Sequence, residues 1–289
     1  MIRFGQAGNC DRFYAEGNTA SEQSPAWIAA QGLDAYEYAA GHGLRLSEEK
    51  ALKIGGAARE AGIAVSIHAP YYINCGNIEK RESSIQYLLN SAQAVSWMGG
   101  SRVVFHPGSP GSQSREDAVS TMLDTIAAAR LRLDEAGFEH VVLCPETMGR
   151  PSQLGTLEEV LLICRMIERT LPAVDFAHLH ASGCGALNCT DDFESVITSM
   201  QEALGWERIR HFHAHFSHIA YTAKGEKCHM TFEDAGHGPD FENLAPVLIK
   251  YRLEPTIICE SSGTQADDAL IMKQIFSKAG GEISTCDRT

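Results

Sequence analysis

Short apolar runs alternate with longer amphipathic stretches along this chain. The apolar runs cover residues 2–5, 33–39, 63–68, 101–106, 140–146, 173–178, 209–215 and 255–260. Several of them are continuous and rich in β-branched residues, which is typical of strands buried on both faces of a parallel sheet. The pattern therefore predicts strands connected by helices rather than an antiparallel sheet.

The stretches between these runs carry apolar residues at helical spacing. They cover residues 47–61, 79–98, 115–136, 156–170, 191–204, 241–251 and 267–278. Thr156 and Glu159 have the spacing of a capping box at the start of one of these helices. Eight strands that alternate with helices predict the α/β class and a (β/α)8 TIM barrel, with a doubly wound open sheet as the alternative. We expect a single TIM-barrel domain over residues 1–279 and a disordered tail over residues 280–289.

Composition and charge narrow the classes of protein to which the chain can belong. The chain has 289 residues and a formal charge of −13, which argues against a basic surface for nucleic acid over the whole sequence. There is no long apolar run, so we expect no membrane segment and a cytoplasmic location. The nine cysteines are scattered without a CxxC pair, which favours reduced thiols.

Candidate chemistry lies at the ends of the predicted strands. Six successive strands end with residue types that bind metals, and these residues include His68, His106, Glu146, Asp175, His178, His213 and Glu260. The carboxyl ends of all strands meet at one mouth of a barrel, so these side chains are expected to converge there. Imidazole and carboxylate ligands suit zinc, manganese or iron, and the set is too large for one tetrahedral ion. The sequence therefore predicts a cluster of two or three ions.

Several of these positions lie in short motifs that match a known family. The motifs are His68-Ala-Pro-Tyr71-Tyr-Ile-Asn74, Phe105-His106-Pro-Gly108, Pro145-Glu146-Thr-Met148, Asp175-Phe-Ala-His178, His213 and Cys259-Glu260-Ser261. Over about residues 60–265 the chain resembles the endonuclease IV family of AP endonucleases, which are TIM barrels of the xylose-isomerase-like superfamily with three zinc ions.

The resemblance implies a role for each matched residue. One ion would be bound by His68, His106 and Glu146, a second by Glu146, Asp175, His213 and Glu260, and a third by His178 and His229, with Glu226 as a further candidate ligand. Glu146 and Glu260 would be the catalytic residues, and Tyr71 and Asn74 would contact the substrate. We interpret His215 as a residue that orients ligands or contacts substrate, with a polar loop residue as the open alternative.

Three features depart from the family pattern. The third ion usually has an Asp-x-His pair, whereas this chain reads Glu226-Lys-Cys-His229. The histidine usual after the first strand is absent, and Gln6 stands near that position. The loop after the second strand, from Glu37 to Gly43, lacks basic residues.

The function implied by the resemblance is zinc-dependent hydrolysis of a phosphodiester, with DNA containing abasic sites as the partner and a monomer as the expected state. Up to three zinc ions would be bound, and manganese or iron are alternatives. A metal-dependent sugar isomerase or epimerase of the xylose-isomerase-like type is the competing enzyme class. A metal-binding barrel without activity is the non-enzymatic alternative.

Overall fold

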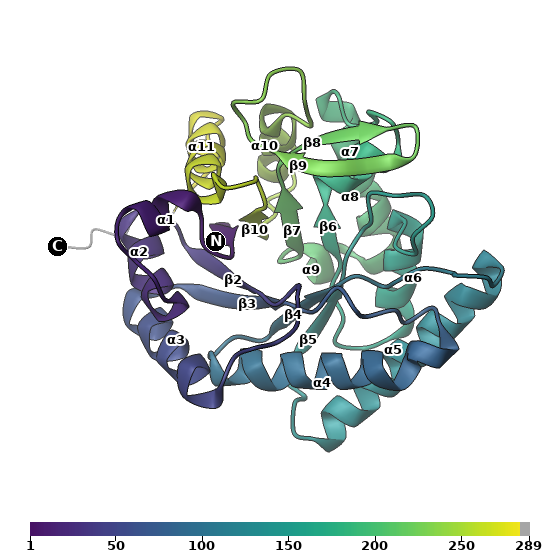
Figure 1. The fold of residues 1–289 in the computed structure, drawn as a ribbon. Coiled ribbons are helices and arrows are strands. Elements are labelled where there is room, and N and C mark those ends of the chain that lie inside the picture. The colour runs from purple at the N-terminus through teal and green to yellow at the C-terminus, as the bar shows by residue number, and fades with distance from the viewer. Residues whose placement is uncertain (284–289) are drawn as a thin grey trace.

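Eight parallel strands form the centre of the molecule, and helices surround them (Figure 1). The structure is a computed structural model that describes residues 1–283. The central strands are β1 (Arg3–Ala7), β2 (Ala35–Ala39), β3 (Ala64–His68), β4 (Arg102–Phe105), β5 (Val142–Pro145), β6 (Ala173–Asp175), β7 (His213–Phe216) and β10 (Thr256–Cys259). Their order in the sheet is β5-β4-β3-β2-β1-β10-β7-β6.

The two ends of this sheet meet and close a barrel. Parallel bridges join Leu143 to Thr170 and Glu146 to Ala173, so β5 lies beside β6. The predicted (β/α)8 TIM barrel is therefore confirmed, and the alternative of a doubly wound open sheet is wrong.

The helices cover the outside of the barrel. They are α1 (Asp11–Ala15), α2 (Ser24–Ala30), α3 (Glu48–Ala61), α4 (Arg81–Trp97), α5 (Arg115–Glu135), α6 (Leu157–Met166), α7 (Phe176–Ser182), α8 (Thr190–Leu204), α9 (Trp206–Ile209), α10 (Phe241–Lys250) and α11 (Gln265–Lys278), with short 3-10 turns at Ser21–Gln23 and Ile78–Lys80. The predicted capping box starts α6: the Glu159 amide donates to the Thr156 hydroxyl at 3.2 Å, and the Thr156 amide donates to the Glu159 carboxylate at 3.0 Å. This helix ends at Met166, four residues before the predicted end, because Ile167 adopts an extended backbone.

An antiparallel hairpin follows β7 and was not predicted. It consists of β8 (His218–Thr222) and β9 (Gly225–Met230), and it lies beside α7 at the rim of the barrel (Figure 1). Its residues are mostly polar and half-exposed, so no apolar run marks it in the sequence.

The apolar core lies mainly between the strands and the helices, while the barrel interior near its mouth is polar. Phe4 of β1 packs against Phe241 of α10 and Phe276 of α11, with ring centroids 6.0 and 5.8 Å apart. Charged side chains that face the interior, such as Glu37 and Glu146, are fully buried. The apolar packing outside the barrel therefore offsets the free-energy cost of burying these charged groups in the interior.

Other sequence predictions concern the whole chain. Residues 280–283 form no helix or strand, and the rest of the predicted tail, residues 284–289, lies outside the described residues. The single domain over residues 1–279 stays a prediction. No helix in residues 1–283 has the length and apolar character needed to cross a lipid bilayer. No disulfide links the cysteines within the described part of the chain.

Candidate metal centre

The strand ends bring most of the predicted metal-binding side chains to one mouth of the barrel. They come from the last residues of β3 and β6, from β7, from the residues directly after β4, β5 and β10, from the first turn of α7 and from β9. Three overlapping groups of histidine and carboxylate side chains have ligand atoms within 4.8 Å of one another. The groups are His68, His106 and Glu146; Glu146, Asp175, His215 and Glu260; and Asp175, His178 and His229.

The first group brings two imidazoles to one carboxylate oxygen. Oε2 of Glu146 lies 3.0 Å from Nε2 of His68 and 3.1 Å from Nε2 of His106. Nδ1 of His68 lies 2.9 Å from the Ala69 carbonyl oxygen and can donate to it. That hydrogen bond leaves the Nε2 lone pair of His68 free to bind a cation.

The second group joins three carboxylates through one histidine. Nδ1 of His215 lies 3.1 Å from Oε1 of Glu146 and 3.4 Å from Oε2 of Glu260. Oδ2 of Asp175 is buried and has no hydrogen-bond partner among the described residues. Its nearest charged neighbour is Nδ1 of His178 at 3.3 Å. A cation between these side chains would satisfy this buried oxygen.

The third group depends on the start of α7 and on the hairpin. Asp175 caps α7 by accepting a hydrogen bond from the His178 amide at 2.7 Å, which fixes the two side chains beside each other. Nε2 of His229, on β9, lies 3.7 Å from Oε2 of Glu260. Oε2 of Glu226 lies 3.6 Å from Nε2 of His178, so this carboxylate also faces the third group.

A glycine allows the hairpin to approach the mouth this closely. The Glu226 amide donates to the Gly149 carbonyl at 2.9 Å. A Cβ atom on Gly149 would lie 2.7 Å from Cβ of Glu226 and 2.8 Å from Cδ2 of His178. Any larger residue at this position would separate the hairpin from α7.

Burial and mutual charge shift the pKa values of these groups. Burial by itself would lower the pKa of His68, but the hydrogen bond to Glu146 and the charge of that carboxylate raise it to about 9. Burial has the same effect on His178, and the charges of Asp175 and Glu146 raise its pKa to about 10. Burial raises the pKa of Asp175, and the nearby His178 and His229 offset this only in part. Without a cation, His68 and His178 therefore hold protons that balance the carboxylates.

The structure places His213 differently from the sequence prediction. Along β7 alternate side chains point into the barrel, so His213 and His215 both face inward but at different depths. His215 is in register with Asp175, whereas His213 is in register with Ala173, nearer the amino end of the strands. His215 therefore occupies the place in the second group that the resemblance gave to His213. Two histidines with the same orientation cannot be ranked by depth from the sequence alone.

Sequence reasoning also missed Glu37. This residue is fully buried in the middle of β2. It lies within the predicted run 33–39, but it was considered only as the start of the loop from Glu37 to Gly43. It forms a further group with His213 and His215, within the same 4.8 Å limit. A charged residue inside an apolar run was the available signal, since such residues are rarely buried without a partner.

The two predicted substrate residues lie at a pocket beside the first group. This pocket has a volume of about 340 Å³, and Tyr71, Asn74 and His106 are among its lining residues. The Tyr71 ring stacks on the His106 ring, with centroids 5.1 Å apart, and is 53% exposed. The Asn74 side chain is already engaged, because its amide donates to the Ser109 hydroxyl and its oxygen accepts from the Ser109 amide. Tyr71 is therefore the freer of the two to meet a substrate.

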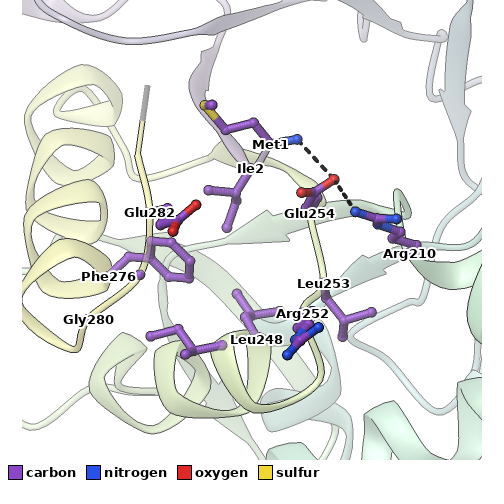
Figure 2. Close-up of a pocket in the computed structure, with 12 residues that line it drawn as sticks. Met1, Ile2, Arg210, Leu248, Arg252, Leu253, Glu254, Phe276, Gly280 and Glu282 are labelled. Atoms are coloured by element: carbon purple, nitrogen blue, oxygen red, sulfur yellow. Dashed lines mark ion pairs between the residues drawn. The ribbon is translucent and has the colours of Figure 1, made fainter. Parts of the chain in front are cut away.

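A second pocket lies at the opposite end of the barrel. It has a volume of about 450 Å³, and Figure 2 shows that Glu254 at its edge pairs with both the amino group of Met1 and the Arg210 guanidinium. It contains none of the residues of the three groups.

The donor set fits divalent cations of the first transition series. It combines imidazole nitrogens with carboxylate oxygens, the mixture that such ions accept. Glu146, Asp175 and Glu260 come within reach of one histidine, and such a concentration of buried carboxylates requires compensating positive charge. The buried Oδ2 of Asp175, which accepts no hydrogen bond among the described residues, supports the same conclusion.

Comparisons with known proteins agree with this architecture. A protein of Methanocaldococcus jannaschii described as uncharacterized is 31% identical over 80% of this chain and 83% of its own length. A probable endonuclease 4 of Shouchella clausii is 28% identical over 60% of this chain and 58% of its own length.

Solved structures of two enzyme classes share the fold to the same degree. Endonuclease IV from Thermus thermophilus superposes with a TM-score of 0.68 at 19% identity, covering 96% of this chain and 98% of the other. An L-ribulose 3-epimerase also gives 0.68, at 14% identity, covering 97% and 96%. The family described as the xylose isomerase-like TIM barrel matches residues 25–275. The chain belongs to this family of xylose isomerase-like TIM barrels.

Proposed function

We propose that this protein is a metal-dependent phosphodiester hydrolase that binds up to three zinc ions and cleaves DNA at abasic sites. The observation that carries this proposal is the overlap of the groups: Glu146 belongs to two of them, and so does Asp175. Shared carboxylates make one continuous centre for several ions, which suits the in-line displacement of a phosphodiester. The similarity to probable endonuclease 4 proteins supports the same reaction class.

Each residue of the centre would have a distinct part in the reaction. Bound ions would activate water and neutralise the charge on phosphate. Glu146 would set the spacing between the first and second groups. Glu260 lies nearest the opening of the three carboxylates of the second group, with its side chain 15% exposed, so it is placed to accept a proton from water at Oε2. The exposed face of Tyr71 would pack against the sugar of the substrate.

A sugar isomerase or epimerase is the second candidate. The group of Glu146, Asp175, His215 and Glu260 has enough ligands for one ion, which is what such an enzyme needs. The histidines of the other two groups have no evident use in that reaction. They favour the hydrolase.

One experiment separates these candidates. The purified protein is analysed for its metal content and then incubated with a duplex oligonucleotide that contains an abasic-site analogue, with and without a chelator. In parallel, it is incubated with ketose sugars in the presence of manganese. We expect incision that the chelator abolishes and zinc restores. A fully metal-loaded protein that does not incise the duplex would rule out the nuclease, and sugar epimerisation with one or two manganese ions would establish the second candidate.

A further inference from the structure

Glu37 lies directly beneath the second group, inside the barrel. Its side chain is fully buried. Oε1 lies 2.9 Å from Nε2 of His215, and Oε2 accepts a hydrogen bond from the Ser66 hydroxyl at 2.7 Å. Oε2 also lies 3.0 Å from Nε2 of His213. Three polar side chains thus surround a carboxylate that has no access to solvent.

Three histidines of the centre, His68, His215 and His229, direct one ring nitrogen toward the carboxylates and the other toward an outer partner. The outer partner of His68 is the Ala69 carbonyl oxygen, and that of His229 is the Ser217 hydroxyl. In His178 a single nitrogen, Nδ1, contacts both the Thr147 carbonyl oxygen and the carboxylates. For His215 the outer partner is Glu37. Glu37 is therefore the charged member of a set of otherwise neutral outer partners.

We propose that Glu37 is the positioning residue for His215. By accepting the proton on Nε2, it selects the tautomer whose Nδ1 lone pair points at Glu146 and Glu260. A hydrogen bond to an anionic acceptor also makes the imidazole a more basic metal ligand than a hydrogen bond to a carbonyl oxygen would. This inference rests on the metal centre of the proposed function, and it holds whichever reaction that centre performs.

Ser66 and His213 keep Glu37 in place. A single buried carboxylate would be costly, but the hydroxyl of Ser66 donates to it and the ring of His213 lies against the same oxygen. The neighbouring strands fix this arrangement, because Glu37 on β2 is in register with Ser66 on β3. His213 thus acts through Glu37, one layer below the ions.

The same three residues could instead bind an ion of their own. Glu37, His213 and His215 are fully buried with ligand atoms within 4.8 Å, and neither ring nitrogen of His213 has a hydrogen bond among the described residues. Such an ion would make Glu37 a ligand rather than a positioning residue. The number of ions bound by a Glu37 variant distinguishes the two cases.

The test compares the full-length wild-type protein with Glu37→Gln, using zinc and cobalt as probes. At saturating zinc we expect the same number of ions in both proteins. We expect one ion to bind the variant about 10- to 100-fold more weakly in competition with a chelator. The visible spectrum of the cobalt-loaded variant should also change. Glu159→Gln is the matched control, since Glu159 is a mostly buried carboxylate in the α6 cap that does not touch the centre.

A double-mutant cycle with His215→Ala shows whether Glu37 acts through that histidine. In the His215→Ala background, Glu37→Gln should weaken zinc binding no further. If Glu37→Gln folds poorly, nitrogen NMR of the histidines in the zinc-loaded wild-type protein provides a second readout, and the His215 proton should reside on Nε2.

Several outcomes would overturn the proposal. They are the loss of one whole ion from Glu37→Gln at saturating zinc, unchanged zinc affinity in that variant, or a His215 proton on Nδ1. A wild-type protein that binds no zinc would contradict both this inference and the metal centre. Intact zinc binding without incision of abasic DNA would contradict the proposed reaction alone.

Discussion

Two residues, Glu146 and Asp175, hold the centre together because each contributes to two groups of ligands. Glu146 contacts imidazoles through both of its oxygens, with Oε2 near His68 and His106 and Oε1 near His215. Burial would raise the pKa of Glu146, but the surrounding histidines lower it well below its usual range. The Glu146 carboxylate is therefore ionised at neutral pH, and its negative charge would attract a cation bound on either side of it.

Replacement of Glu146 by Gln tests this shared role. The amide keeps the volume but cannot serve two cations, so we expect activity to fall by at least about 100-fold and the bound metal to decrease. Circular dichroism should remain unchanged. Glu82→Gln, an exposed carboxylate on α4, is the control. Full turnover in Glu146→Gln would show that this residue does not bridge ions.

The pKa values of the histidines predict how metal binding depends on pH. In the metal-free protein the pKa of His68 is about 9 and that of His178 about 10, so both imidazoles are protonated at neutral pH. An ion must displace these protons, and its affinity should rise with pH up to about 9 to 10. The gain should be about tenfold per pH unit for each proton displaced.

Calorimetry measures this proton release directly. Zinc titrations in two buffers with different heats of ionisation should give different apparent enthalpies. Identical enthalpies, together with an affinity that does not change between about pH 6 and pH 9, would contradict the proposed protonation of His68 and His178.

At the scale of elements, the β8–β9 hairpin completes a centre that the barrel strands begin. It supplies His229, and it brings Glu226 to within 3.6 Å of His178. The barrel strands by themselves provide the first two groups. Binding of the third ion should therefore require the hairpin, whereas binding of the other two ions should not.

Replacement of His229 by Ala should remove one ion and leave the rest bound. We expect elemental analysis to show one ion fewer per chain, with little change in thermal stability of the zinc-free protein. His211→Ala is a suitable control, because His211 is a half-exposed residue outside the three groups. Loss of every ion from His229→Ala would indicate a centre that assembles only as a whole.

The capping box of α6 predicts a substitution that lowers the stability of the protein but leaves its metal centre unchanged. Thr156→Ala removes the acceptor for the Glu159 amide and should cost about 1 kcal/mol. Chemical denaturation should show a lower free energy of unfolding, and the metal content should remain the same. A change in metal content would mean that α6 contributes to the centre in a way that its contacts do not reveal.

At the scale of the whole molecule, the barrel confines several carboxylates within a polar interior. Cations bound there would stabilise the folded chain, because they bind the native state and not the unfolded one. Each ion present at about a thousand times its dissociation constant would add about 4 kcal/mol.

Removal of metal should therefore lower the melting temperature by about 8 °C or more for each ion lost, while the barrel remains folded. Differential scanning calorimetry with and without a chelator measures the change, and the far-ultraviolet spectrum verifies the fold. An identical melting temperature in a protein shown to have lost zinc would contradict this coupling of metal binding to stability.

The alternation of strands and helices could be predicted from the amino-acid sequence, because apolar periodicity is a local property of the chain. The sequence also identified most of the candidate ligands, since His68, His106, Glu146 and Glu260 each lie where an apolar run ends. Barrel topology then requires such ends to meet at one mouth.

Which histidine of β7 reaches the second group becomes clear from the folded barrel alone. His213 and His215 have the same spacing pattern and the same inward orientation, and their difference in depth depends on the register between β6 and β7. The contacts of Glu37 likewise depend on distant segments. Strand β2 lies beside β3, which provides Ser66, and the barrel brings β7 with its two histidines to the same interior. Depth and register are relations between distant segments, so the local pattern of apolar and polar residues cannot predict them.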